Sequence, residues 1–363
     1  MASSHAFLLN DVAGRRLGPL GYESASYTMS ANAPATLSLS LPLGVGADID
    51  EGQIVEVWRT PGAPVPLWPQ DEYIVTNVKR NVTASGNVFY AVDAQDMLWV
   101  LSGYVNRYGS NNWMGAADDY MRAVFRGNFM SDGPSDGNIS AAARARSLMF
   151  SMNVKCEPDM GVGPKIKTTS PGGQVLSVLQ ATAKKAMVPD GYPSITGRPL
   201  FFDMYAHQRN PLGFTFAVFA DQRGRDLTTH TPVILSVNRE LMKVEIEQDF
   251  ASEVNAVFYK TGATTRVRVD TARSLRGPLA RREGSAGAVM DATTALREGI
   301  PPYQIRASLV DTANGVYGRD YSWGDAVLVN TGGQLLPMRL DTVSITLDAA
   351  GNEQKSGRLN LIM

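Results

Sequence analysis

The 363-residue sequence predicts a mainly β protein (α+β class) with two similar β-barrels and a small α/β insertion that forms a helix-containing middle domain. Three observations lead to this fold class. Short alternating segments, separated by turn residues at even spacing, occupy both ends of the chain, as in small barrels and sandwiches. Apolar residues at helical spacing are concentrated in the middle. A β-hairpin pattern near the start of the chain returns near its end.

The repeated pattern is a glycine and a polar residue that open a strand, an alternating strand, and an Ala-x-Gly-Asn turn. The first copy covers residues 52–57 and 76–87, and the second covers residues 324–329 and 341–352. Residues 76–87 align with 341–352 without a gap, at an offset of 265. The aligned identities are Val78/Val343, Ala84/Ala349, Gly86/Gly351 and Asn87/Asn352.

This pattern supports a specific structural hypothesis, although hairpins share turn chemistry and four identities can arise without duplication. If the repeat is structural, the strands through residues 55–57 and 327–329 occupy equivalent positions in two barrels. The first copy has the longer loop, residues 60–71, and we expect the barrels to differ most there. A chain with two similar modules can form a ring of higher pseudo-symmetry than its oligomer, which indicates an assembly function.

Residues 1–105 are expected to form the first, tube-like β-barrel. Apolar and polar side chains alternate in its segments, and a loop rich in Pro and Gly at residues 60–66 interrupts them. The strand-like segments are 22–29, 35–41, 54–58, 73–75 and 88–92.

Residues 106–200 are expected to form the helix-containing middle domain. Residues 96–101, just before it, are typical of a short helical turn or a strand end. A helix is predicted over residues 116–126, where the acidic residues lie early and the helix dipole favours them. A second helix is predicted over residues 174–187, and Pro189 ends it.

Residues 201–300 are expected to form a second β-rich domain, which includes an Arg-rich loop at 271–288. A hairpin around Gly262 and a short helix at 289–298 are predicted inside it. Residues 301–363 supply strands of the final barrel, completed by earlier segments. The strand-like segments after the helices are 200–205, 214–219, 233–235, 243–247, 254–259, 265–269 and 305–309.

Composition excludes several classes of protein. The formal net charge is −1, without the basic surplus of a duplex-DNA binder. The single cysteine, Cys156, rules out an intrachain disulfide framework and zinc sites built from paired cysteines. No apolar run reaches about 18 residues, so no membrane span is expected. The N-terminus lacks the features of a signal peptide.

No stretch of the sequence predicts a catalytic, cofactor or metal site. His5, His207 and His230 are far apart and have no metal-ligand spacing. Phosphate-binding and nucleophile-elbow motifs are absent. Cys156 could act as a nucleophile only with a base beside it in space, and the acidic residues 48–51 are typical of a polar turn before a strand. We therefore predict no enzyme and no cofactor.

Eight stretches follow one another along nearly the whole chain. The first is a strand after an acidic turn, the third and fourth are the two predicted helices, and the last enters the final barrel. They are residues 50–59, 92–101, 117–128, 173–183, 202–204, 221–227, 252–257 and 318–327. In this order the chain resembles the baseplate hub, or tail-tip, structural proteins of long-tailed bacteriophages.

The resemblance implies a homotrimer in the virion, made in the cytoplasm of the host bacterium. Two barrels in each of three chains give a pseudo-sixfold ring, which joins the distal tail or tail-tube proteins to a spike or fibre protein. The ring surrounds a channel for the tape-measure protein, and DNA passes through its lumen without specific binding. Since the sequence stops at Met363 directly after the last strand, we expect any wall-degrading activity to reside in another protein.

Two other functions stay open at this level. A receptor-binding or carbohydrate-binding adhesin would need the dispersed tryptophans to converge on one exposed groove. The same resemblance also covers the hub of a phage-derived injection machine or of a gene transfer agent. A peptidoglycan hydrolase has no nucleophile, metal set or acid pair to support it. The tryptophans are Trp58, Trp68, Trp99, Trp113 and Trp323.

Overall fold

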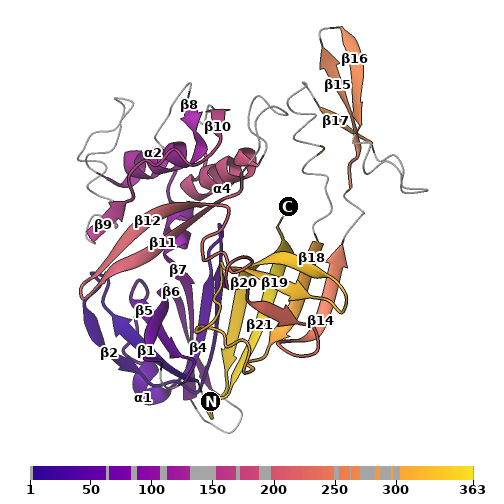
Figure 1. Cartoon of the computed structure of the whole chain (residues 1–363). Coiled ribbons are helices and arrows are strands. Elements are labelled where there is room, and N and C mark those ends of the chain that lie inside the picture. Colours follow the sequence, from indigo (N-terminus) through magenta and orange to yellow (C-terminus); the bar gives the residue numbers. More distant parts are fainter. Residues whose placement is uncertain are drawn as a thin grey trace.

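The fold was established from a computed structural model of the chain (Figure 1). The structure describes residues 3–62, 65–82, 88–106, 113–130, 153–168, 172–187, 198–248, 253–261, 263–269, 283–286, 296 and 303–362.

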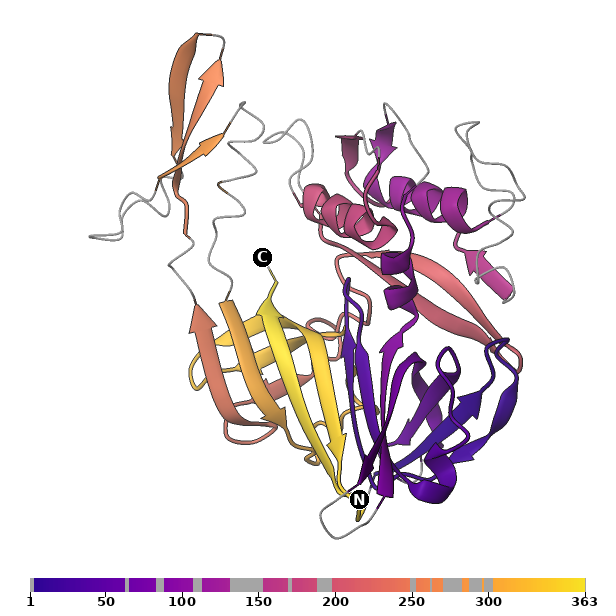
Figure 2. The same cartoon turned by 180° about the vertical axis from the view of Figure 1, so that it is seen from behind.

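Thirteen strands form one continuous sheet with two parts. The N-terminal strand group contains β1 (Ser4–Asn10), β2 (Arg16–Leu20), β3 (Ser24–Ser30), β4 (Thr36–Pro42), β5 (Ile54–Thr60), β6 (Trp68–Val82) and β7 (Val88–Asp96). The C-terminal strand group contains β13 (Ile234–Ser236), β14 (Leu241–Gln248), β18 (Tyr303–Leu309), β19 (Ala326–Asn330), β20 (Leu335–Leu347) and β21 (Glu353–Leu361). Figures 1 and 2 show the two groups side by side.

The two groups are joined by one ladder, which we call the seam. Strand β3 pairs antiparallel with the second half of β20, from Ala25 opposite Leu347 to Ser30 opposite Thr342. The main order of the sheet is therefore β14-β18-β21-β20-β3-β4-β7-β6-β5-β1-β2, and β19 pairs with the first half of β20. Segments more than 300 residues apart in sequence are neighbours in one sheet.

One hydrophobic core lies under both groups, because alternate residues of each strand point inward. In β4, Leu37, Leu39 and Leu41 are buried while the residues between them are not. The seam contributes Tyr27 and Ile345, which are both fully buried in the same core. The two strand groups thus share apolar packing as well as backbone hydrogen bonds.

A helical layer lies at one end of the N-terminal strand group in Figures 1 and 2. Its core is formed by the apolar faces of two helices against a long hairpin, with Phe125 stacked on Phe216 at 4.4 Å between ring centroids. The elements are η1 (Met97–Gly103), β8 (Trp113–Ala116), α2 (Ala117–Phe129), β9 (Asn153–Cys156), β10 (Lys165–Thr168), α4 (Val175–Ala186), β11 (Leu200–Arg209) and β12 (Leu212–Ala220). The short helix α1 (Leu43–Gly46) belongs to the first strand group and lies against β7 and β4.

A small separate sheet leaves the second strand group between β14 and β18. It consists of β15 (Ala256–Thr261), β16 (Thr264–Val269) and β17 (Glu283–Ala286), in the order β16-β15-β17. In both views it stands apart from the thirteen-stranded sheet (Figure 2).

Most of the expected elements are confirmed. The mainly β character, the two helices, the helical turn after Asp96 and the hairpin around residue 262 are present. The loop expected over 271–288 is wrong in part, because Glu283–Ala286 pairs in parallel with β15. The remainder of that loop and the turn at 83–87 lie outside the described residues, as does the helix predicted at 289–298 except for Leu296, which is helical.

Candidate assembly site

The two strand groups repeat the same order of five strands. In the first group the order is β3-β4-β7-β6-β5, and in the second it is β14-β18-β21-β20-β19. In the β6–β7 ladder the register shifts after Val75, and in the β20–β21 ladder it shifts after Leu340. These residues are 265 apart, which is the offset of the sequence repeat. Val75 pairs with Ala94 and Leu340 with Leu359, again 265 apart.

The predicted equivalence of residues 55–57 and 327–329 is confirmed in strand order and register. Val55 pairs with Tyr73, and Val327 pairs with Met338, which is 265 residues after Tyr73. The valines at both ends of each stretch point into the core and are fully buried. The sequence repeat is therefore a repeat of structure.

Two glycines open the equivalent strands for the same backbone reason. Gly52 and Gly324 have φ angles of +86° and +82°, a left-handed conformation that glycine adopts without a steric penalty. The Gly52 N–H donates to the carbonyl of Val75 at 2.8 Å, and the Gly324 N–H donates to that of Leu340 at 2.7 Å. The left-handed glycine thus allows β5 to begin beside the register shift of β6, and β19 to begin beside the register shift of β20.

The expectation that the two copies differ most at residues 60–71 is wrong. The first hairpin is longer there: Ile54 pairs with Ile74, while its equivalent Ala326 pairs with Arg339. A larger difference lies elsewhere. Strands β3 and β4 are joined by a short turn, whereas their equivalents β14 and β18 are separated by residues 249–302, which include β15–β17. The repeat covered only the later strands, so it gave no sign of this insertion.

A buried ion-pair cluster, here called the lock, holds the two strand groups together at the start of β21. The Arg59 guanidinium donates two hydrogen bonds of 2.8 Å to Glu353 and one of 3.0 Å to the Tyr317 carbonyl. Lys355 lies 2.9 Å from Glu353. His5 Nε2 lies 3.0 Å from the Tyr27 hydroxyl and 3.4 Å from Glu353.

The electrostatics of the lock favour one charge state. Burial alone raises the pKa of Glu353, but the hydrogen bonds and charge of Arg59, with Lys355, lower it to about 2. Burial lowers the pKa of His5 to about 4 in spite of Glu353, so the ring is neutral at pH 7. The lock is therefore one buried carboxylate between two cations, and it fixes β1 and β5 against β21.

Two strand edges have no partner within the described part of the chain. Strand β5 pairs with β6 only as far as Ile74, so the outer edge of residues 77–82 is open. Strand β14 pairs with β18 on one side only, and it forms the outer margin of its group in both views (Figure 2). Each edge carries an exposed apolar side chain: Val82 is 62% exposed and Ile246 is 50% exposed.

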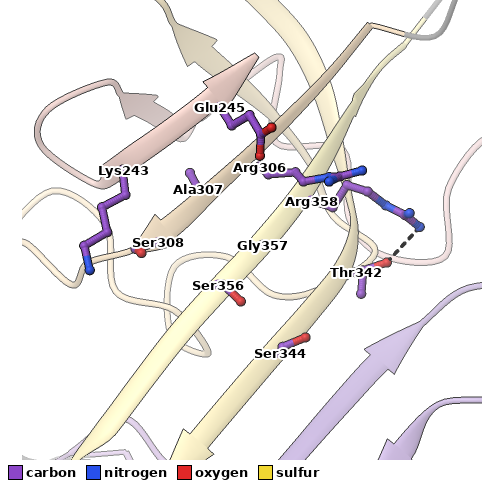
Figure 3. A pocket seen from close by; sticks show the side chains of 10 residues that line it. All are labelled: Lys243, Glu245, Arg306, Ala307, Ser308, Thr342, Ser344, Ser356, Gly357 and Arg358. Atoms are coloured by element: carbon purple, nitrogen blue, oxygen red, sulfur yellow. Dashed lines mark hydrogen bonds between the residues drawn. The ribbon is translucent and has the colours of Figure 1, made fainter. Parts of the chain in front are cut away.

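The face of the sheet opposite the core is covered by short hydroxyl side chains. A shallow hollow of about 290 Å³ lies on this face over β14, β18, β21 and β20 (Figure 3). Within it Arg358 donates a 3.2 Å hydrogen bond to the Thr342 hydroxyl. The hydroxyl residues that point away from the core along the eight strands from β14 to β6 include Ser24, Ser26, Thr28, Ser30, Thr36, Ser38, Ser40, Ser308, Thr342, Ser344, Thr346 and Ser356.

Two ion pairs lie on this hydroxyl-rich face. Lys79 lies 3.7 Å from Asp93, and Arg306 lies 2.9 Å from Glu247. A surface with small polar side chains and balanced charge offers water contact without a strong field for a polyanion.

Carboxylates also gather where the helical layer meets the first strand group. Burial, followed by the charges of neighbouring carboxylates, raises the pKa of Asp71 well above its usual range, and burial does the same for Asp96. Glu72 is held by Arg209, which reaches it from the end of β11. Since Asp96 also accepts a hydrogen bond from the Leu98 amide at 3.1 Å, these groups serve the packing of the two layers.

The described residues contain no arrangement typical of an active site. No group of three or more His, Cys, Asp or Glu side chains among them could hold a metal ion. His207 lies 2.9 Å from the Thr215 hydroxyl and is not part of the lock that contains His5. Burial raises the pKa of the Cys156 thiol to about 12, which keeps it protonated. No helix in the described part of the chain is long and apolar enough to cross a bilayer.

The tryptophans lie on different elements, and two of them, Trp68 and Trp99, are each 37% exposed. Trp323 is 7% exposed, with the Arg223 guanidinium 4.0 Å from its ring centre. Trp58 has Arg16 and Arg209 over its ring at 5.9 and 5.7 Å. The contacts of these two rings are thus with arginines of the same chain, as in the packing role of an aromatic side chain.

The fold matches solved tail proteins along nearly its whole length. A tail protein from Neisseria meningitidis MC58 has a TM-score of 0.57 at 13% sequence identity, with 99% of this chain and 97% of that chain covered. The 43 kDa tail protein of prophage MuSo2 from Shewanella oneidensis has a TM-score of 0.58 at 12% identity, with 98% and 97% covered. The prophage tail protein gp18 from Listeria monocytogenes EGD-e has a TM-score of 0.49 at 8% identity, with 98% and 94% covered.

No protein-family model matches the chain, and no curated protein sequence does. The expected resemblance to phage tail proteins is confirmed as a likeness of fold that extends over the whole chain.

Proposed function

We propose that the protein is a structural hub of a phage tail tip or baseplate. Three copies form a pseudo-sixfold ring, in which each strand group is one barrel. The ring joins the sixfold tail tube to a threefold spike or fibre protein and surrounds the channel for the tape-measure protein and DNA. Its place is the virion, and it is made in the cytoplasm of the host bacterium.

The observation that carries the proposal is the duplicated order of five strands. Two copies with the same strand order and register lie edge to edge in one chain through the seam. Three such chains offer six similar units, which is the number needed to match a sixfold partner while keeping threefold symmetry. The likeness of fold to two tail proteins supports the same role.

The hydroxyl-rich face supports a channel. Eight strands per copy, from β14 to β6, give a wall of 24 strands in three copies. Barrels of about 16 to 18 strands already leave a water-filled passage, so a wall of this size leaves a wider one. Its short side chains and paired charges let DNA pass without specific binding.

The proposed domain boundaries follow from this arrangement. Residues 1–105 are the first barrel, and the strands from residue 301 onward form the second with β13 and β14. The helical layer is the middle domain, and we place β11 and β12 with it because they share its core.

The proposed role involves no covalent chemistry. A zymogram with bacterial cell walls should show no clearing by the purified chain, because the described residues offer no nucleophile, metal set or catalytic acid pair. Clearing that is lost on mutation of this chain would contradict the proposal.

The ring itself is tested by mass. Multi-angle light scattering of the chain, alone and with its tail-tube partner, should give species that contain three copies of the 39.2 kDa chain. A chain that stays monomeric alone and inside the assembled tail, or that enters it in another number of copies, would contradict the proposal.

A further inference from the structure

The two open edges are the structural equivalents of the two strands of the seam. The second half of β6 corresponds to the second half of β20, and β14 corresponds to β3. Inside the chain, the second-group strand β20 pairs with the first-group strand β3. The equivalent of β20 in the first group is the second half of β6, and it has no strand paired along its outer edge among the described residues. The outer edge of β14 is also unpaired among these residues.

We infer that β14 of one copy pairs antiparallel with residues 77–82 of β6 in the next copy, so that the seam is repeated between chains. The inference rests on the proposed ring and names the contact that closes it. A strand edge left open invites pairing with another chain, and a second copy of this chain presents the matching edge.

The register between the chains follows from the register of the seam. Residues of β20 correspond to residues of β6 at an offset of 265. Tyr27 of β3 pairs with Leu37, and Ile246 of β14 pairs with Ile305, which takes the place of Leu37 in the second strand group. Residues of β14 therefore correspond to residues of β3 at an offset of 219. In the seam Ser344 is opposite Thr28. The equivalent of Ser344 in β6 is Lys79, and the equivalent of Thr28 in β14 is Glu247. At the open edges the same pairing therefore places Lys79 opposite Glu247.

The charges fit this register. Lys79 and Glu247 have opposite signs and lie on the same hydroxyl-rich face, where directly opposed pairs stabilise a ladder. Their partners within each chain extend the pattern, since Lys79 is 3.7 Å from Asp93 and Glu247 is 2.9 Å from Arg306. Across the joined edges the charges alternate in sign over four neighbouring strands.

The apolar side chains fit as well. The transferred register places Val82 opposite Val244, as Leu347 is opposite Ala25 in the seam. It also places Ile246 opposite Arg80, whose aliphatic stem can cover an apolar neighbour. Val82 and Ile246, which are more than half and half exposed in the single chain, become covered when the edges pair.

Cysteine pairs test the register directly. Lys79→Cys with Glu247→Cys, in a Cys156→Ser background, places two thiols on opposite positions of the joined strands. Opposed residues in an antiparallel ladder have Cα atoms about 4.5–5.5 Å apart, within the range that a disulfide spans. On oxidation of the full-length protein in its assembled state, we expect disulfide-linked dimers and trimers on a non-reducing gel.

Two matched controls belong to this experiment. Thr28→Cys with Ser344→Cys is the equivalent pair of the seam. It should form a disulfide within one chain, so the chain should still run as a monomer on the non-reducing gel. Lys79→Cys with Lys243→Cys places the second thiol four residues out of register, and it should give no linked chains. Equal cross-linking of the in-register and out-of-register pairs would overturn the inference.

A charge exchange gives a second readout that does not depend on oxidation. Lys79→Glu and Glu247→Lys should each weaken association of copies about 3- to 5-fold at every contact, since they oppose like charges. The double variant should recover part of it, because positions 79 and 247 again have opposite charges while Asp93 and Arg306 then lie beside like charges. A three-copy ring without 79–247 cross-links and without this rescue refutes the strand pairing but leaves the proposed function intact. Cross-linking of β14 to a different protein also refutes it, whereas absence of any three-copy species refutes the ring itself.

Discussion

Removing the Glu353 carboxylate leaves Arg59 as an uncompensated charge in the core. Arg59 is completely buried, and two of its three hydrogen bonds go to Glu353 at 2.8 Å. Loss of one partner of a buried ion pair costs about 3–5 kcal/mol, because the other charge stays out of water. We expect Glu353→Gln to lower the free energy of unfolding by about 3 kcal/mol, and Glu353→Ala to lower it further.

Two controls separate this effect from a general loss of charge. Asp159→Asn breaks the exposed pair with Arg126, and exposed pairs contribute about 0–1 kcal/mol. Arg59→Met combined with Glu353→Met removes both buried charges, so it should be less destabilised than Glu353→Gln.

Urea unfolding and hydrogen exchange measure the effect together. Glu353→Ala should lower the free energy of unfolding most and Glu353→Gln by less, while Asp159→Asn and the double methionine variant should each lower it less than Glu353→Gln does. Exchange of the β3 and β20 amides should accelerate in Glu353→Gln, because the lock lies beside the seam. If Glu353→Gln costs no more than Asp159→Asn, the lock does not hold the two strand groups, and the reasoning from its burial is refuted.

Three further predictions concern single residues. The pKa of His5 in the folded chain is lowered from 6.5 to about 4, so the neutral ring contributes fully to stability above pH 6.5, and this contribution is lost as the pH falls toward 4. His5→Gln should therefore flatten the pH dependence of the free energy of unfolding between pH 6.5 and 4. An unchanged slope would contradict the lowered pKa of His5. Gly324→Ala should destabilise more than Gly332→Ala, since both have positive φ but only the Cβ at 324 comes within 3.2 Å of neighbouring atoms; equal urea midpoints would argue against the crowding. The Cys156 thiol, whose pKa burial raises to about 12, should resist alkylation at pH 8 in the folded chain and react in urea, and rapid labelling of the folded chain would show that it is accessible as thiolate.

The sequence was most informative where a local pattern determines local structure. Alternation predicted strands such as β4, and helical spacing with early acids predicted α2. The repeat near both ends also gave the offset of 265 that the shared register shifts after Val75 and Leu340 reproduce. Hairpins are local, so their residues carry enough information to place them.

Contacts between distant segments were not predicted from the sequence. The seam depends on which strand edges remain open after all hairpins have formed, and no single segment carries that information. The lock gave only a weak signal: His5, Arg59 and Glu353 occupy inward positions of their strands, where an apolar residue is the rule. An ionisable residue at an inward strand position was therefore a sign of a buried partner, but its identity required the fold.

The ring of equivalent strand groups is tested most directly by cryo-electron microscopy of the assembled tail tip. We expect three copies of this chain around one axis, with β14 of each copy hydrogen-bonded to residues 77–82 of the next and the hydroxyl-rich face lining the channel. A map in which the copies number other than three, or in which the six strand groups are not arranged with sixfold-like spacing, would contradict it.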